Sequence, residues 1–261
     1  MNKILENELF KKNINIKNIK YLTMIGQVSM RFINESLFPW ACEKGYLSLA
    51  KWLWEVSCKS IDVHAGDECA FRWTCKNDHL EIAKWLWEVS HKSINIHVNN
   101  KYIFCGTCLN GHLEVAKWIW EVSQRETREI GRETKNIDIH VYNEYAFCWT
   151  CYNGHFEIVK WLWEVSCKSI DIHACNECAF RLSCKSGHLE IAKWLWKVSC
   201  ESIDIHAGYE YAFRGACENG YLEIAQWLWE ISCGSINIHI KDNFVFKIKH
   251  KNILKWLNSL E

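Results

Sequence analysis

The sequence predicts an all-α solenoid of stacked helix-turn-helix units. The segment KWLW or a close variant recurs along the chain, with its first tryptophan at Trp52, Trp85, Trp118, Trp161, Trp194 and Trp227. The steps between these tryptophans are 33, 33, 43, 33 and 33 residues. A fixed period of this length is the signature of a repeat architecture. The apolar residues around each segment follow a helical period, which makes the repeating unit helical.

The period divides the chain into a cap, six repeats and a truncated seventh copy. The N-terminal helical cap is 1–34, and a truncated C-terminal capping repeat is 243–261. The repeats span 35–67, 68–100, 101–143, 144–176, 177–209 and 210–242. Residues 247–256 are basic, which suits an end cap because the terminal units of a solenoid need a polar outer face. A contact with nucleic acid or acidic lipid is the alternative interpretation of this basic end.

Each repeat is predicted to begin with a short helix, which is ECAFRWTCK in the repeat 68–100. Asp67 is its expected N-cap, because a short polar side chain there can accept from the first free N–H groups. The equivalent residues are Asn100, Asn143, Asn176 and Asp242, with Tyr209 as the exception. One arc of the helix is nearly constant between copies and is expected to face the core: Ala70, Phe71, Thr74 and Cys75. The opposite arc varies strongly, which favours a recognition face: Cys69, Arg72, Trp73 and Lys76.

A tight turn and a second helix follow. Asp78 stands where the other copies have glycine, and both residue types tolerate the left-handed conformation that ends a helix. The second helix is expected over 80–90, and a polar connector, HKSINIH, leads to the next repeat. On a helical wheel Trp85 and Trp87 point about 160° apart. They cannot form one platform for nucleic-acid bases, so we expect them to pack against neighbouring repeats on opposite sides.

The one long step carries ten extra residues within QRETREIGRETKN, 124–136. The segment is highly charged, so we predict a mobile surface excursion. An added recognition loop is the alternative.

Charge and composition exclude several function classes. Lys plus Arg and Asp plus Glu are 31 each, which removes the long-range attraction that nucleic-acid and anionic-membrane binders use. No apolar run approaches the roughly 18 residues of a membrane span, and the start MNKILENELFKKN lacks a secretory core. The chain has 15 cysteines, an odd count that favours reduced thiols and a cytoplasmic, reducing location.

Cysteine and histidine recur in columns, which favours structural roles over metal binding. CxxC pairs occur at Cys105/Cys108, Cys148/Cys151 and Cys175/Cys178. The first two arise where two columns coincide, so we expect packing rather than zinc or redox chemistry. Histidines close each connector, as at His64, and open most second helices, as at His79. We expect them to bind backbone groups at the turns. No catalytic signature is present, so we expect no enzyme activity and no cofactor.

The repeat resembles the ankyrin repeat. The segments NGHLEVAKWIW (110–120) and SGHLEIAKWLW (186–196) are similar to that family's G-H-L-E-[IV]-V-K-L-L-L segment, and the match covers roughly 35–242. The Trp- and Cys-rich character resembles the divergent arrays of giant DNA viruses of amoebae. The family's T-P-L-H opening is replaced by CAFR (69–72), YAFC (145–148) and YAFR (211–214). The connector also differs in length, so we expect short or irregular β-fingers.

The resemblance implies a non-enzymatic scaffold that binds a protein partner, as a monomer, through a concave face of first helices and connectors. Tyrosine, tryptophan and arginine most often anchor interfaces. The candidate partner-binding residues are therefore Trp73, Tyr102, Tyr145, Trp149, Tyr152, Tyr211, Arg72, Arg181 and Arg214. We expect no nucleic acid, membrane or small-molecule substrate. The alternatives are a substrate-recruiting adaptor of a ubiquitin ligase, a metal- or redox-binding repeat protein, and duplicated repeats without a selected partner.

Overall fold

A computed structural model describes residues 16–24, 26, 29–58, 60–91, 93–96, 103–130, 137–238 and 248–260. Within these ranges every regular element is a helix and no strand occurs, which confirms the all-α prediction. The described connectors form no β-finger, in line with the expected shortening. The chain divides into two compact units, one of residues 1–103 and 114–131, the other of residues 104–113 and 132–261.

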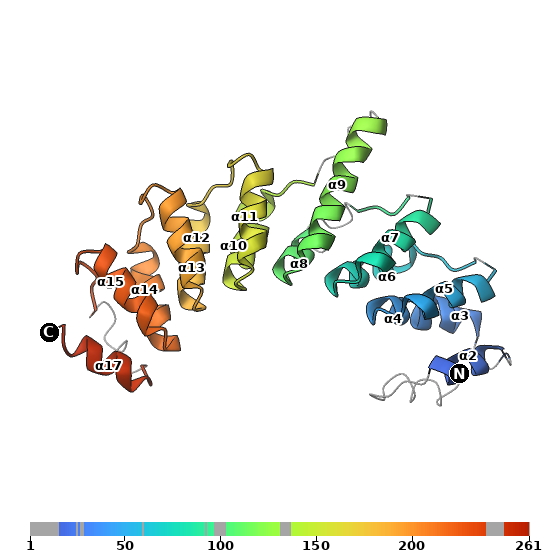
Figure 1. Cartoon of the computed structure of the whole chain (residues 1–261), viewed down its shortest axis with the longest axis horizontal. Coiled ribbons are helices and arrows are strands. Elements are labelled where there is room, and N and C mark those ends of the chain that lie inside the picture. Colours follow the sequence, from blue (N-terminus) through green and yellow to red (C-terminus); the bar gives the residue numbers. More distant parts are fainter. Residues whose placement is uncertain are drawn as a thin grey trace. The chain divides into compact units, whose positions relative to one another are not determined.

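The first unit contains two complete helix pairs, α4 with α5 and α6 with α7, in which α4 also packs on α6 (Figure 1). Its helices are α2 (Ile16–Met24), α3 (Met30–Phe32), the π-helix η1 (Ile33–Leu37), α4 (Phe38–Glu43), α5 (Leu47–Val56), α6 (Ala65–Lys76), α7 (Leu80–Val89) and all but the first residue of α9 (Leu113–Ile130). Residues 1–15 of the predicted N-terminal cap lie outside the described residues.

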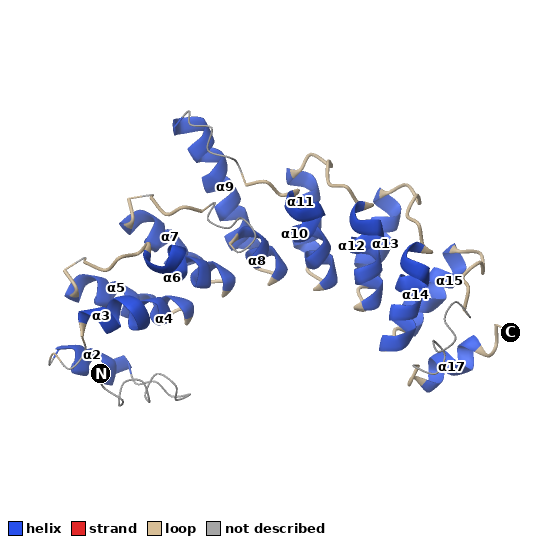
Figure 2. Ribbon diagram, turned by 180° about the vertical axis from the view of Figure 1, so that it is seen from behind, coloured by secondary structure: helices blue, strands red, loops and turns tan. Residues whose placement is uncertain are grey.

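The second unit stacks three helix pairs. Its helices are α8 (Phe104–Leu109), α10 (Val141–Tyr152), α11 (Phe156–Val165), α12 (Ala174–Lys185), α13 (Leu189–Val198), α14 (Ala207–Asn219), α15 (Leu222–Ile231) and α17 (Lys251–Leu257). Helices α10, α12 and α14 lie side by side in one row, and each pairs with the helix that follows it (Figure 2).

The tryptophan pair of each second helix ties its repeat to both neighbours. The Trp85 ring lies 6.1 Å from Phe38 and 6.3 Å from Trp54, both in the preceding repeat. The Trp87 ring lies 6.5 Å from Trp118 of the following repeat, edge to face. The same contacts recur in the second unit, where Trp194 meets Trp163 at 6.0 Å. Contacts on opposite sides confirm the core role predicted for the two indoles.

The turn between the two helices also agrees with the sequence. Gly45, Gly154 and Gly187 have φ of 79°, 81° and 89°, and Asp78 adopts φ 63° in the same place. In each glycine turn the ring of the next repeat covers the glycine. A Cβ built on Gly187 would lie 2.5 Å from the Tyr221 ring.

The start of the first helix differs from the prediction. Asp67 is not an N-cap, because Gly66, Asp67 and Glu68 all have positive φ, at 63°, 53° and 61°. The same left-handed turn occurs in three other repeats, where its middle residues are Asn143, Asn176 and Tyr209. Asn and Asp tolerate this conformation better than other residues with a side chain. This preference explains why Asp and Asn recur at these positions, although they are not the N-caps that the sequence predicted. Asn100 and Asp242 lie outside the described residues.

The described part of the insertion is helical. Helix α9 has 18 residues, whereas α7 has 10. The Glu, Arg and Gln residues that follow Ser123 are good helix formers. Elsewhere the second helix stops at a left-handed residue such as Cys167, with φ 53°. The helix therefore continues to Ile130 and forms the first part of the predicted surface excursion, while 131–136 lie outside the described residues.

Candidate interaction surface

A buried glutamate closes each left-handed turn and fixes the start of the first helix. Glu68, Glu144, Glu177 and Glu210 are 3–6% exposed. In the turn at the start of α12, His173 Nδ1 donates to Glu177 Oε1 over 2.8 Å. The same Glu177 oxygen accepts from the Asp204 amide of the next connector over 3.3 Å. Because each carboxylate joins two repeats, it holds neighbouring first helices in a fixed register.

The histidine columns have two different partners. The opening histidines bind backbone groups as predicted: His79 Nε2 donates to the Glu43 carbonyl and His188 Nε2 to the Tyr152 carbonyl, each over 2.9 Å. For the closing histidines the prediction was wrong, because the ring of His64 bonds the side chain of Glu68 at 2.9 Å. The Glu68 carboxylate was not recognised as the partner of His64 because it lies four residues later, inside a turn that the sequence did not predict.

The three candidate arginines use part of their hydrogen-bonding capacity within the turn. Arg72 donates to the Gly66 carbonyl and Arg181 to the Cys175 carbonyl, each over 3.0 Å. Arg214 Nε donates to the Tyr209 carbonyl over 2.7 Å. Each guanidinium therefore stabilises carbonyls of a strained turn. Their half-buried side chains keep a positive charge on the outer arc of the first helices.

Three of the predicted aromatic residues form a ladder along α10. The rings of Tyr145 and Trp149 lie 5.9 Å apart, and those of Trp149 and Tyr152 lie 5.1 Å apart. Trp149 is 37% exposed. An indole held between two tyrosines and open to solvent can bury further apolar area against another molecule.

Lys185, Arg181 and Tyr211 form a cationic cluster on α12 and α14. The Arg181 guanidinium lies 5.1 Å from the centre of the Tyr211 ring, a cation–π distance. Lys185 Nζ donates to the Tyr211 hydroxyl over 2.9 Å. That hydrogen bond is the main cause that raises the pKa of Lys185, so the lysine stays charged at neutral pH.

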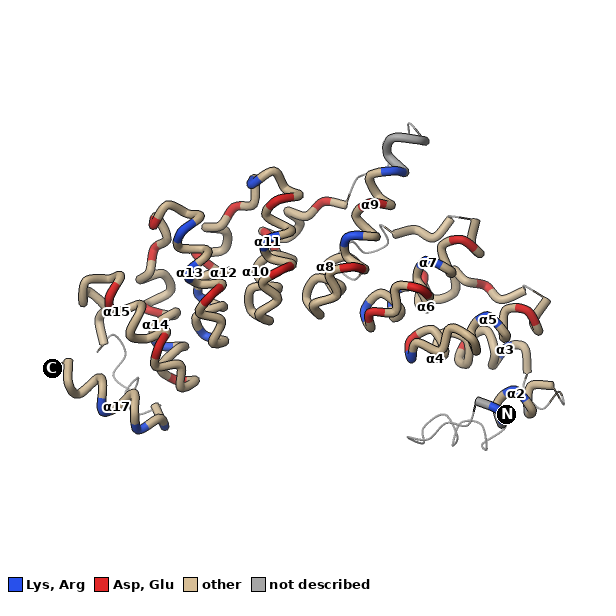
Figure 3. Tube along the Cα trace, viewed as in Figure 1, with Lys and Arg blue, Asp and Glu red and all other residues tan. Residues whose placement is uncertain are grey.

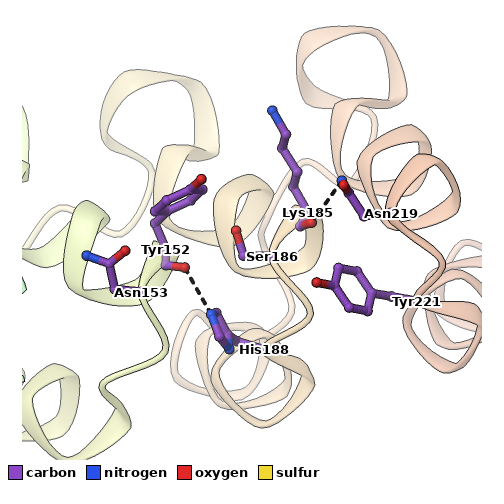
Figure 4. Close-up of a pocket in the computed structure, with 7 residues that line it drawn as sticks. All are labelled: Tyr152, Asn153, Lys185, Ser186, His188, Asn219 and Tyr221. Carbon is purple, nitrogen blue, oxygen red and sulfur yellow. Dashed lines mark hydrogen bonds between the residues drawn. The ribbon is translucent and has the colours of Figure 1, made fainter.

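A shallow depression of about 370 Å³ connects the ladder to the cationic cluster. It lies where α10, α12 and α14 end, and its lining residues are Tyr152, Asn153, Lys185, Ser186, His188, Asn219 and Tyr221 (Figure 4). Asn219 Nδ2 donates to the Lys185 carbonyl over 3.2 Å, which fixes the rim between two repeats. Amide, hydroxyl and ammonium groups therefore line this part of the surface. We call the residues Tyr145, Trp149, Tyr152, Arg181, Lys185 and Tyr211 the α10–α14 surface.

Of the other predicted site residues, Arg214 lies on α14, next to this surface, and Arg72 and Trp73 belong to the first unit. Trp73, 39% exposed, lies in the first unit with Arg72, and Lys76 Nζ is 4.8 Å from its ring. Tyr102 lies outside the described residues. Acidic and basic residues are interspersed along the helices (Figure 3).

Among the described residues no helix is both long and apolar enough to cross a membrane. The same part of the chain has no group of three or more His, Cys, Asp or Glu residues placed to hold a metal ion.

Sequence reasoning missed one contact between neighbouring first helices. Hydrogen bonding between the thiols of Cys148 on α10 and Cys178 on α12 shifts the pKa of both. The pairing crosses from one repeat to the next rather than within a CxxC motif. The available signal was positional, because Cys148 occupies the place of Arg181 and Cys178 the place of Tyr211.

Comparisons with known proteins agree with this architecture. A family model described as ankyrin repeats (3 copies) matches residues 105–209 and 147–242, which together cover more than half of the 261 residues. A search of curated proteins found no match. The crystal structure of the human ASB11 ankyrin repeat domain is similar to the chain, with a TM-score of 0.59 and 14% identity over 87% of this chain and 98% of that one. At that identity the likeness concerns the fold alone. The family match shows that the chain belongs to the ankyrin-repeat family.

Proposed function

We propose that the chain is a non-enzymatic scaffold whose α10–α14 surface binds an acidic segment of a partner protein. Ankyrin repeats are a general protein–protein interaction module. The observation that carries the proposal is the solvent-exposed Trp149, which stands between two tyrosines on α10. Tryptophan and tyrosine are enriched among the few residues that carry most of the binding energy of protein interfaces.

The charges beside the ladder support an acidic partner. Arg181, Lys185 and Arg214 bring three positive charges to the outer arcs of α12 and α14, against the single carboxylate of Glu218 there. Complementary charge favours encounter with an acidic segment and disfavours basic ones. An apolar or aromatic side chain of the same segment would pack on Trp149.

We further propose that the protein works as a monomer in a reducing compartment such as the cytoplasm. Five of the 15 cysteines are exposed thiols: Cys58, Cys167, Cys175, Cys200 and Cys233. Exposed free thiols persist where the surroundings keep them reduced.

Affinity purification from the cells that make the protein, followed by quantitative mass spectrometry, tests the proposal. The test variant combines Tyr145→Ala, Trp149→Ala and Tyr152→Ala. The matched control combines Glu157→Ala, Lys160→Ala and Glu164→Ala on α11 of the same repeat. We expect at least one protein to be retained by the wild type and the control and lost with the test variant, while circular dichroism shows all three folded. Equal recovery from all three would exclude the ladder, and co-purification of ubiquitin-ligase subunits would favour the adaptor function.

A further inference from the structure

Neighbouring first helices in the second unit meet in a fixed register. Arg181 of α12 lies 5.1 Å from the Tyr211 ring of α14. One repeat earlier, the residues at these two places are Cys148 of α10 and Cys178 of α12. The register that stacks Arg181 on Tyr211 therefore brings two thiols together between α10 and α12, and these helices pack directly on each other.

The two thiols differ in their surroundings. Cys148 is 4% exposed, whereas Cys178 is half-buried and reachable from solvent. Only this pair of neighbouring repeats has cysteine at both places. The corresponding pairs elsewhere, apart from Arg181 with Tyr211, are Pro39 with Cys69, Arg72 with Tyr102, and Cys105 with Tyr145. The pair is thus a local departure from the repeat pattern rather than a consequence of it.

The surroundings shift the pKa values of the two thiols in opposite directions. The hydrogen bond from Cys148 lowers the pKa of Cys178, and the nearby positive charge of Arg181 lowers it further. Cys148 itself keeps its proton, because the same hydrogen bond and the burial of Cys148 both raise the pKa of its thiol. By contrast, burial alone raises the pKa of Cys75 and Cys184, two cysteines of the core column. The thiolate, not the thiol, is the reactive form.

We propose that Cys148 and Cys178 form a hydroperoxide-reactive thiol pair that closes to a disulfide between two repeats. The Cys178 thiolate attacks the O–O bond, takes one oxygen as sulfenic acid and releases an alkoxide or hydroxide, which picks up a proton. The Cys148 sulfur then attacks the Cys178 sulfur, and its proton leaves with the hydroxyl group as water. Two thiols are oxidised, and one hydroperoxide is reduced to an alcohol, or to water when hydrogen peroxide is the oxidant.

The disulfide would lock α10 against α12 beside the aromatic ladder. Cys148 directly precedes Trp149, so the link fixes the backbone that carries the exposed indole. Repeats contact only their neighbours, and a covalent bond between two of them resists local separation of the stack. The chemistry does not depend on the proposed partner, so it can be tested separately.

Peptide mapping of the purified full chain after treatment with about one equivalent of hydrogen peroxide tests the proposal. Trypsin leaves Cys148 in 136–160 and Cys178 in 169–181. We expect these two peptides to become linked, and thiol reductant to separate them. Oxidation should raise the thermal midpoint of the wild type. In Cys148→Ser the sulfenic acid should accumulate on Cys178, where dimedone traps it.

The variants decide which thiols are joined. The link should vanish in Cys148→Ser and in Cys178→Ser but persist in the control Cys175→Ser, with all variants checked by circular dichroism. The proposal is overturned if the peptides remain separate in the wild type. It is also overturned if the link survives in Cys178→Ser, or if Cys167 and Cys200 are oxidised while Cys178 stays free.

Discussion

His173 donates a hydrogen bond of 2.8 Å to the carboxylate of Glu177, a side chain that is only 6% exposed. The bond spans a turn of three left-handed residues, Cys175 to Glu177, each of which costs roughly 1–2 kcal/mol of conformational strain. The same carboxylate reaches the next connector, so one residue both holds a strained turn and joins two repeats.

Glu177→Gln should destabilise the second unit. An amide replaces a charged acceptor that serves His173 and the Asp204 amide, and hydrogen bonds to charged groups contribute about 1.5–3 kcal/mol each. We expect a lower urea midpoint, with a loss of free energy of unfolding of about 1–3 kcal/mol. Glu190→Gln, on the exposed side of α13, is the matched control and should change stability by less than about 0.5 kcal/mol. Equal effects would remove the special role of the buried carboxylate.

Gly187→Ala should also destabilise the fold. Its φ of 89° is unfavourable for a residue with a side chain, and the new Cβ would lie 2.5 Å from the Tyr221 ring. We expect a cost of about 1–2 kcal/mol or more in thermal or urea unfolding. Gly106→Ala is the control, because a Cβ on Gly106 meets nothing within 4 Å. It lies within α8 and should be neutral or stabilising by up to about 1 kcal/mol.

Mild acid should weaken the fold partly through His155. Burial lowers the pKa of His155 below its ordinary 6.5. The unfolded chain therefore binds this proton more readily, so the contribution to stability is complete above pH 6.5 and is lost as pH falls below it. The thermal midpoint should therefore be lower at about pH 5 than at about pH 8. The fall should be smaller in His155→Tyr, a residue that Tyr221 already provides at the same place. If the thermal midpoint of His155→Tyr falls with pH as steeply as that of the wild type, other groups cause the acid effect.

The thiols should separate into a reactive and a protected class. A thiol reagent should rapidly modify the exposed cysteines, such as Cys200, in the native protein. Burial raises the pKa of Cys217 to about 12, and that residue should react only after unfolding. Cys184→Ser should cost about 1–3 kcal/mol, because a hydroxyl replaces a fully buried thiol. Cys200→Ser should be neutral. Rapid modification of Cys217 in the folded chain would contradict this packing.

Much of the fold follows from the sequence because its signals are local and repeated. The helical period places Phe71 and Cys75 in the core, and both are fully buried. The fixed spacing assigns Trp85 and Trp87 to opposite neighbours, as observed. Asp78 in the glycine column indicates a left-handed residue, and its φ is 63°.

Other features depend on contacts that a helical wheel does not contain. The left-handed turn at the start of α6, α10, α12 and α14 is held by the buried glutamate, which bonds a histidine four residues earlier and an amide of the next repeat, as at Glu68. The Cys148–Cys178 contact depends on how α10 packs on α12. The length of α9 depends on the absence of a stop signal after Ser123, and the charged composition of 124–136 did not reveal that the helix continues. For the candidate surface, spacing predicted the ladder on α10, while the link from Lys185 to Tyr211 emerged only from the packing of α12 on α14.

The most direct test of the proposed function is the dissociation constant of a purified captured partner, measured by calorimetry for the wild type, Trp149→Ala and the control Lys160→Ala. If the α10–α14 surface is the binding site, removal of the central indole should weaken binding by about 2 kcal/mol or more, roughly 30-fold. Lys160→Ala should bind like the wild type. A Trp149→Ala protein that is folded and binds with an unchanged dissociation constant would contradict the account and place the site elsewhere on the chain.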